Sequence, residues 1–305
     1  MPPELTCNIL PDLPPELTIA QAIQTGMQQL AVSSDTPRLD SEILLLHALN
    51  THHDAEHSTP KTRTWLLTWP ETRLSETQWV KFQQASTARA IGKPVAYITN
   101  EQGFWSFELE FTADTLIPRP ETELLVECAL DKIPLNRHLT ILDAGTGSGA
   151  IALAIASERS HSKITAADVS RAALEVAQRN AHRLELDNIV FLHSFWFESI
   201  SPRRFDLIVS NPPYIPEADP HLQQASLQYE PQLALSSGAD GLDALRIIIL
   251  QGHNYLNTGG WLMFEHGYDQ QQAVQSLLHT ANFRHIFTIN DLNDQPRVSM
   301  GQKCQ

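Results

Sequence analysis

The chain has 305 residues, of which 42% are hydrophobic and 18% are charged, and its formal net charge is −14. This length suits one large domain with a smaller one, or two medium ones, and the composition is that of an ordinary globular protein. The negative charge disfavours a protein whose main task is to bind nucleic acid, because phosphates attract basic surfaces. The sequence contains no run of 18 apolar residues, so we expect no membrane-spanning helix.

The N-terminal stretch MPPELTCNILPDLPPELT has no basic segment followed by an apolar one, so we expect no secretory signal. The three cysteines, Cys7, Cys128 and Cys304, are far apart and form no CxxC pair. Reduced thiols in a cytoplasmic protein are therefore the expected state.

Residues 1–90 are predicted to form a helical domain. Apolar residues recur at spacings of three and four along three segments, 17–30, 37–50 and 75–91. Ser75 and Glu76 stand in capping positions before the third helix.

Three histidines, His52, His53 and His57, cluster between the second and third predicted helices. A metal site needs ligands at fixed geometry, and no cysteine is near. We interpret the cluster as a polar loop and predict no metal.

Residues 91–117 are predicted to form a β-hairpin linker. In PVAYITNEQGFWSFELEFTADTLI, residues 94–117, aromatic and β-branched residues alternate around Asn100 and Gly103.

From residue 118 to 305 the pattern predicts an α/β domain with a mainly parallel sheet. Apolar strands are predicted at 140–145, 163–170, 188–192, 205–210 and 260–267. Amphipathic helices are predicted at 148–158, 171–184 and 241–256. The tail, FRHIFTINDLNDQPRVSMGQ, predicts a closing antiparallel pair of strands with a turn at Asn293-Asp294.

The first βα unit, LTILDAGTGSGAIALAIA, indicates a nucleotide-type site. Asp143 ends its strand, and Gly145, Gly147 and Gly149 allow the backbone to approach a ligand closely. Asp168 ends the next strand and can accept both hydroxyls of a ribose. The alternatives are a plain tight turn and, among ligands, a nicotinamide dinucleotide or S-adenosylmethionine (SAM).

The run Asn211-Pro212-Pro213-Tyr214 directly follows the predicted strand DLIVS. Methylating a planar nitrogen requires acceptors that hold its hydrogens, and the Asn211 side-chain oxygen and the Pro212 carbonyl can supply them. The prolines fix the local backbone, and Tyr214 can stack on a flat substrate group. A proline-rich loop after a strand is the alternative.

Together these motifs resemble the HemK/PrmC family, the N5-glutamine methyltransferases that modify peptide chain release factors. The resemblance covers most of the chain and rests mainly on LIPRPETE (116–123), DAGTGSGAIALAIA (143–156), SNPPYIPEADPHL (210–222), GGWLMFEHG (259–267) and RVSMG (297–301). It implies a Rossmann-like SAM-dependent methyltransferase domain with a mainly parallel seven-stranded sheet, an N-terminal helical domain that recognises the substrate, and a β-hairpin linker.

The resemblance also implies site residues. The SAM-binding residues would be Gly145, Thr146, Gly147, Ser148, Gly149, Asp168, Trp196 and Asn211. The residues that clamp the substrate glutamine would be Asn211, Pro212, Pro213 and Tyr214, with Phe104 as part of the wall. The loop 118–123 would pass beside the methyl donor, although Arg119 and Glu123 also suit a salt-bridged helix start.

The chain departs from the family at Phe195, where an acid usually precedes the tryptophan, and at Asn100 and Gly103 in the hairpin. The implied activity is methyl transfer from SAM to the glutamine of the Gly-Gly-Gln motif of release factors, giving S-adenosylhomocysteine as product. We expect a monomer with a protein substrate. The alternatives are a glutamine of a large-subunit ribosomal protein, an adenine of DNA or RNA, and SAM binding without catalysis.

Overall fold

The computed structural model describes residues 17–51, 59–200 and 203–304. The chain divides into two compact units, Met1–Thr99 and Asn100–Gln305. The histidine cluster at residues 52–58 and Cys7 lie outside the described residues.

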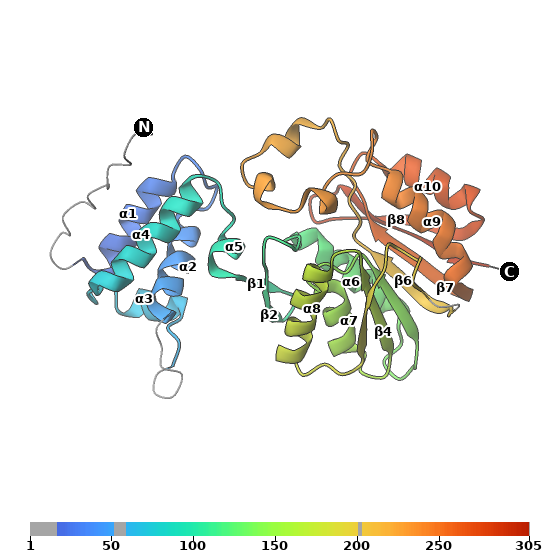
Figure 1. Ribbon diagram of the computed structural model, residues 1–305, viewed down its shortest axis with the longest axis horizontal. Coiled ribbons are helices and arrows are strands. Elements are labelled where there is room, and N and C mark those ends of the chain that lie inside the picture. Colours follow the sequence, from blue (N-terminus) through green and yellow to red (C-terminus); the bar gives the residue numbers. More distant parts are fainter. Residues whose placement is uncertain (1–16, 52–58, 201–202, 305) are drawn as a thin grey trace, which may run out of the picture. The chain divides into compact units, whose positions relative to one another are not determined.

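The first unit is helical. Its elements are α1 (Ile19–Leu30), α2 (Pro37–Asn50), α3 (Arg63–Thr68), α4 (Glu76–Ala90) and α5 (Val95–Thr99) (Figure 1). Capping boxes open α1 and α4, in which Thr18 pairs with Gln21 and Ser75 with Gln78. The three predicted helices are confirmed, and the short α3 is an addition that the apolar spacing did not indicate.

The predicted hairpin at 94–117 is wrong for its first residues, which form the helix α5. Tyr97 donates its backbone N–H to the Pro94 carbonyl, and Val95 and Ile98 pack against the apolar core of the helical unit. This packing outweighs the strand preference of β-branched residues. The hairpin itself is β1 (Glu101–Phe104) and β2 (Phe107–Glu110), and it reverses direction at Trp105-Ser106.

The second unit contains a seven-stranded sheet of order β5-β4-β3-β6-β7-β9-β8, in which β9 is antiparallel to both neighbours. The strands are β3 (Thr140–Ala144), β4 (Lys163–Asp168), β5 (Ile189–His193), β6 (Phe205–Ser210), β7 (Leu256–Glu265), β8 (Phe283–Asn290) and β9 (Pro296–Lys303). The remaining pairs are parallel, so the predicted mainly parallel sheet with a closing antiparallel pair is confirmed.

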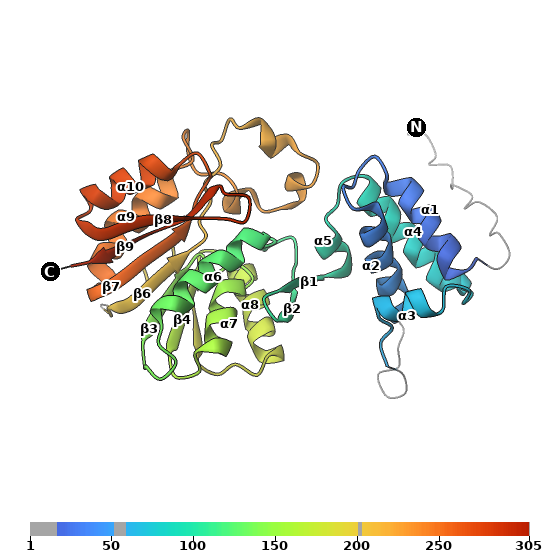
Figure 2. The same ribbon diagram turned by 180° about the vertical axis from the view of Figure 1, so that it is seen from behind.

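Helices cover both faces of this sheet (Figures 1 and 2). They are α6 (Pro120–Lys132), α7 (Ala150–Glu158), α8 (Arg171–Arg183), α9 (Asp243–Tyr255) and α10 (Gln271–Thr280). Alternate strand residues such as Leu142, Ile208 and Phe264 join Leu245 and Leu278 of α9 and α10 in one buried cluster. The sheet is thus the middle of three layers, as in other doubly wound α/β folds.

The β-hairpin is attached to the glycine loop of the sheet through one buried side chain, that of Asn180 on α8. Its Oδ1 accepts from the Glu110 backbone N–H at 2.7 Å, and its Nδ2 donates to the carbonyls of Glu110 at 3.0 Å and Ser148 at 3.1 Å. Asn180 therefore ties β2 to the loop that follows β3.

Within the ranges described above, no helix is long and apolar enough to cross a membrane, and no group of three or more histidine, cysteine or acidic side chains could hold a metal ion. Cys128 and Cys304 form no disulfide. Burial raises the pKa of the Cys128 thiol to about 11, so this thiol stays protonated at neutral pH.

We expect Asn180→Ala to lower the free energy of unfolding by about 2–4 kcal/mol. The substitution removes the hydrogen-bond partner of the Glu110 N–H and of the carbonyls of Glu110 and Ser148. Arg179→Ala is the matched control, since its half-exposed ion pair with Glu110 should contribute less than about 1 kcal/mol. Urea unfolding measures both variants. Equal losses would contradict the tethering role of Asn180.

Candidate functional site

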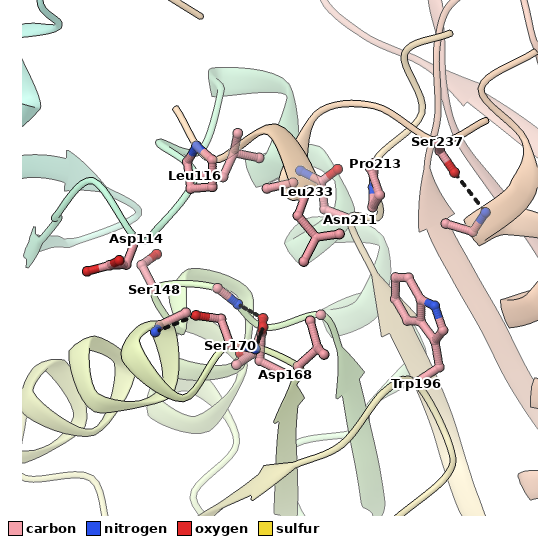
Figure 3. Close-up of a pocket in the computed structure, with 18 of the residues that line it drawn as sticks. Asp114, Leu116, Ser148, Asp168, Ser170, Trp196, Asn211, Pro213, Leu233 and Ser237 are labelled. Carbon is pink, nitrogen blue, oxygen red and sulfur yellow. Dashed lines mark hydrogen bonds between the residues drawn. The ribbon is translucent and has the colours of Figure 1, made fainter. Parts of the chain in front are cut away.

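A cavity of about 400 Å³ opens at the carboxyl ends of β3, β4 and β6. The strand order changes direction between β3 and β6, and ligands of open α/β sheets bind at such a switch point. Figure 3 shows Ser148, Asp168 and Ser170 on one side of the cavity and Asn211 with Leu233 on the other. The size and the mainly apolar lining are those of a small-molecule site.

The glycine loop forms one wall. Gly145, Gly147 and Gly149 have φ values of 82°, 56° and 87°, which side-chain-bearing residues rarely adopt. Thr146 and Ser148 line the cavity together with the first two glycines, whereas Gly149 caps α7 behind the wall. A Cβ on Gly147 would meet no atom within 4 Å, so the backbone is open to a ligand there.

Asp168, at the end of β4, also lines the cavity. Its two carboxylate oxygens each accept a backbone N–H, from Gly147 and from Ser170, both at 2.8 Å. Burial raises the pKa of this carboxyl, and the two hydrogen bonds oppose the rise. Each oxygen can accept a second hydrogen bond, so Asp168 remains able to bind a diol.

Asp143, at the buried strand position before the loop, accepts from the Thr146 hydroxyl at 2.6 Å. Burial, with the nearby charge of Asp168, raises the pKa of Asp143 to about 7. The loop therefore rests on an acid that titrates near neutral pH.

Trp196 follows β5 and lines the cavity with Phe195. A Cβ on Gly145 would lie 3.3 Å from Cζ3 of Trp196, so this close approach of the ring depends on glycine. Phe195 is 45% exposed and adds a second apolar ring to this wall. The predicted place of Trp196 at the adenosyl site is compatible with this geometry.

The Asn211–Tyr214 run leaves β6 at the cavity. Asn211 and Pro213 line it, while Pro212 is buried and Tyr214 lies behind the wall. The Tyr214 hydroxyl donates to Glu265 at 3.0 Å, and its carbonyl accepts from Gln270 at 2.9 Å. Burial, with the nearby charge of Glu265, raises the pKa of Tyr214 far above its usual range, so the hydroxyl remains a donor.

Phe104, the predicted wall residue from the hairpin, is buried in β1 and is not among the cavity-lining residues. Leu116, Pro118 and Thr122, from the motif at 116–123, line the cavity. The structure also adds lining residues that the sequence motifs did not single out: Asp114, Ser170, Leu233, Ser236, Ser237 and Asp243. Several of these added residues lie next to the motifs named above. That proximity is the signal by which the sequence could have indicated them as part of the site.

Leu233 belongs to a segment of three short 3-10 turns, η1 (Pro220–Gln223), η2 (Leu227–Tyr229) and η3 (Gln232–Ala234). This segment is tied down by Glu230, which is buried and pairs with Arg119. Arg119 and Glu123, for which a salt-bridged helix start was the alternative interpretation, each have a different partner. Arg119 precedes α6 in an extended conformation, and Glu123 accepts the backbone N–H of Trp105 at 2.7 Å.

Comparison with known proteins agrees with this geometry. The family model described as "Methyltransferase small domain" matches residues 120–228, and the one described as "PrmC N-terminal domain" matches residues 55–99. The catalytic domain of hMettl16, solved in complex with MAT2A 3′UTR hairpin 6, shares the fold at 15% identity. That match has a TM-score of 0.54 and covers 72% of this chain and 82% of that one. The protein is a methyltransferase of the Rossmann-like class.

Two curated relatives are named release factor glutamine methyltransferase. The one from Shewanella oneidensis is 43% identical over 93% of this chain and 96% of its own. The one from Xylella fastidiosa is 46% identical over 89% and 95%, respectively. The chain belongs to the release factor glutamine methyltransferase family, as the sequence motifs indicated.

Asp143 predicts a pH dependence of stability. Its pKa of about 7 lies above the ordinary 3.8, so the folded state binds this proton more tightly than the unfolded state. The free energy of unfolding must then fall as pH rises from about 4 to 7. Asp143→Asn removes this titration and should raise the thermal midpoint by several degrees at about pH 8, with a smaller gain at about pH 5.

The control is Asp187→Asn, the same substitution at an exposed acid that does not line the cavity. Thermal melts followed by circular dichroism give all three midpoints. An offset for Asp143→Asn that is constant across this range would contradict the raised pKa of Asp143.

Proposed function

We propose that this protein transfers a methyl group from SAM to the side-chain amide nitrogen of the glutamine in the Gly-Gly-Gln motif of peptide chain release factors. The observation that carries the proposal is the position of Asn211 and Pro213, which border the cavity directly after β6. The names of relatives that match 89% and 93% of this chain support the choice of substrate.

The cavity residues fit SAM. Gly145 and Gly147 would let the backbone approach the ligand, and Asp168 would hold the ribose hydroxyls through its remaining acceptor sites. The aromatic rings of Phe195 and Trp196 would offer flat apolar surface to the adenine. When bound, SAM supplies an electrophilic methyl group and becomes S-adenosylhomocysteine.

The chain's own task is to orient a weak nucleophile. An amide nitrogen shares its lone pair with its carbonyl, so it must be held with that lone pair toward the methyl group. Asn211 would accept one amide hydrogen with its side-chain oxygen, and the Pro212 carbonyl would accept the other. Such positioning is worth about 7–11 kcal/mol of barrier in favourable cases. The nitrogen loses its proton to water after it has become cationic.

The structure changes the role proposed for Tyr214. Its hydroxyl is committed to Glu265, so Tyr214 would support the wall behind Asn211 and Pro213 rather than lie on the substrate. Phe104 would support β1 from within the hairpin.

A nucleic-acid adenine is a weaker candidate for the substrate, since the net charge is −14. We therefore propose a protein partner. We also propose that the enzyme acts in the cytoplasm as a monomer.

The substrate is tested with purified protein, SAM and an unmodified release factor, followed by peptide mass spectrometry. We expect one added methyl group on the glutamine of Gly-Gly-Gln. Parallel reactions with a ribosomal large-subunit protein and with adenine-containing DNA serve as comparisons. Methylation of either one in preference to the release factor would overturn the choice of substrate.

Two substitutions separate cofactor binding from catalysis. Asn211→Ala should lower kcat by about 100-fold or more while the Kd of SAM changes little, because the lost acceptor acts on the substrate amide. Asp168→Ala should raise the Kd of SAM at least about tenfold, because it removes the acceptors for the ribose hydroxyls. Calorimetry gives Kd and the methylation assay gives kcat. A large loss of SAM affinity in Asn211→Ala would contradict its role.

A further inference from the structure

Asn211 is one end of a hydrogen-bonded chain that runs behind the cavity. Its Nδ2 donates to the Thr122 hydroxyl at 3.2 Å, and the Thr122 hydroxyl donates to Oε2 of Glu265 at 2.8 Å. Oε1 of the same carboxylate accepts from the Tyr214 hydroxyl at 3.0 Å. Thr122 and Glu265 are each only 1% exposed, so water does not compete for these bonds.

The direction of each bond in this chain follows from the carboxylate at its end. Thr122 gives its single hydroxyl hydrogen to Oε2 of Glu265. The Thr122 oxygen can then only accept, and a donor must face it from Asn211. The Asn211 amide is thereby turned with its NH₂ group toward Thr122, which leaves its carbonyl oxygen for the cavity side.

Several charges act on Glu265. Burial raises the pKa of this carboxyl, and the negative charge of Glu121 adds to the rise. The hydrogen bonds from Thr122 and Tyr214, with the positive charge of Arg297, oppose it. The carboxylate thus receives a donor on each oxygen and has a cation nearby, as a buried acid requires.

We propose that Thr122 and Glu265 are positioning residues that fix the side-chain amide of Asn211 with its carbonyl oxygen toward the substrate. This inference rests on the proposed role of Asn211 as the acceptor for the substrate amide. A flipped Asn211 would present its NH₂ group to the NH₂ group of glutamine. Two donors would then face each other, and the nucleophile would lose the acceptor that orients it.

The places of Thr122 and Glu265 in the fold account for this arrangement. Thr122 lies in the first turn of α6 and lines the cavity, and Glu265 is the last residue of β7. The two are 143 positions apart in the chain. Parallel pairing of β7 with β6 brings Glu265 to the strand end from which Asn211 leaves.

The decisive variant is Thr122→Val, which keeps the shape and removes the hydroxyl. We expect kcat to fall at least about tenfold, with the KM and Kd of SAM within about twofold of the unmodified enzyme. Thr122→Ser retains the hydroxyl and should restore most of kcat. Thr115→Val is the control, because Thr115 is an equally buried threonine whose hydroxyl bonds to the Thr112 carbonyl. It should leave kcat unchanged.

The orientation of the Asn211 amide can be measured by NMR without any substrate, from the side-chain NH₂ signals of ¹⁵N-labelled asparagine. The signal of Asn211 is the one that is missing in Asn211→Ala. We expect slow hydrogen exchange of one Asn211 proton in the unmodified protein and in Thr122→Ser, and faster exchange with a shifted signal in Thr122→Val. An Asn211 signal that does not respond to Thr122→Val overturns the inference, as does a Thr122→Ser variant as impaired as Thr122→Val.

The two readouts separate the inference from the proposed function. If the unmodified protein leaves the release factor unmethylated, the proposed substrate fails, and the NH₂ signal of Asn211 still decides whether Thr122 fixes its amide. If methylation occurs and kcat of Thr122→Val equals that of Thr115→Val, the positioning role fails and the proposed function stands.

Discussion

The parallel pairing of β3 with β4 and with β6 is the constraint on which the site depends. Parallel strands end at the same edge of a sheet, so residues that follow different strands meet there. Gly145 follows β3, Asp168 ends β4 and Asn211 follows β6, and all three line one cavity. The antiparallel β9 lies beyond β7, and β8 is the last strand of the sheet on that side.

Three acids, of which Asp143 and Glu265 are buried and Asp168 is half-buried, give this edge its electrostatic character, and each has different hydrogen-bond partners. Asp168 accepts two backbone N–H groups, Asp143 accepts one hydroxyl, and Glu265 accepts two hydroxyls. Burial raises the pKa of all three, because a charge is less stable away from water. Each acid immobilises the backbone or side-chain groups that donate to it. The three acids thereby hold the loops around the cavity in place.

Local patterns predicted the elements well where periodicity and packing agree. The strands of the sheet and the cap of α4 follow from apolar spacing and from the capping residue Ser75. The stretch 95–99 was misassigned because its β-branched residues favour a strand, while their contacts with the helical core select a helix. Glu230, the partner of Arg119, lies 111 positions along the chain, so no local pattern indicated it.

The sequence by itself determined the fold class, the family and the positions of the glycine loop, Asp168 and Asn211, because these depend on short-range patterns and on motif spacing. Tertiary structure alone decided which side of the Asn211 amide faces the cavity. That choice requires Thr122 and Glu265, which meet across 143 positions of the chain. The physical reason is that a hydrogen-bonded chain has a direction only when its last acceptor is in place, and the folding of β7 beside β6 places it there.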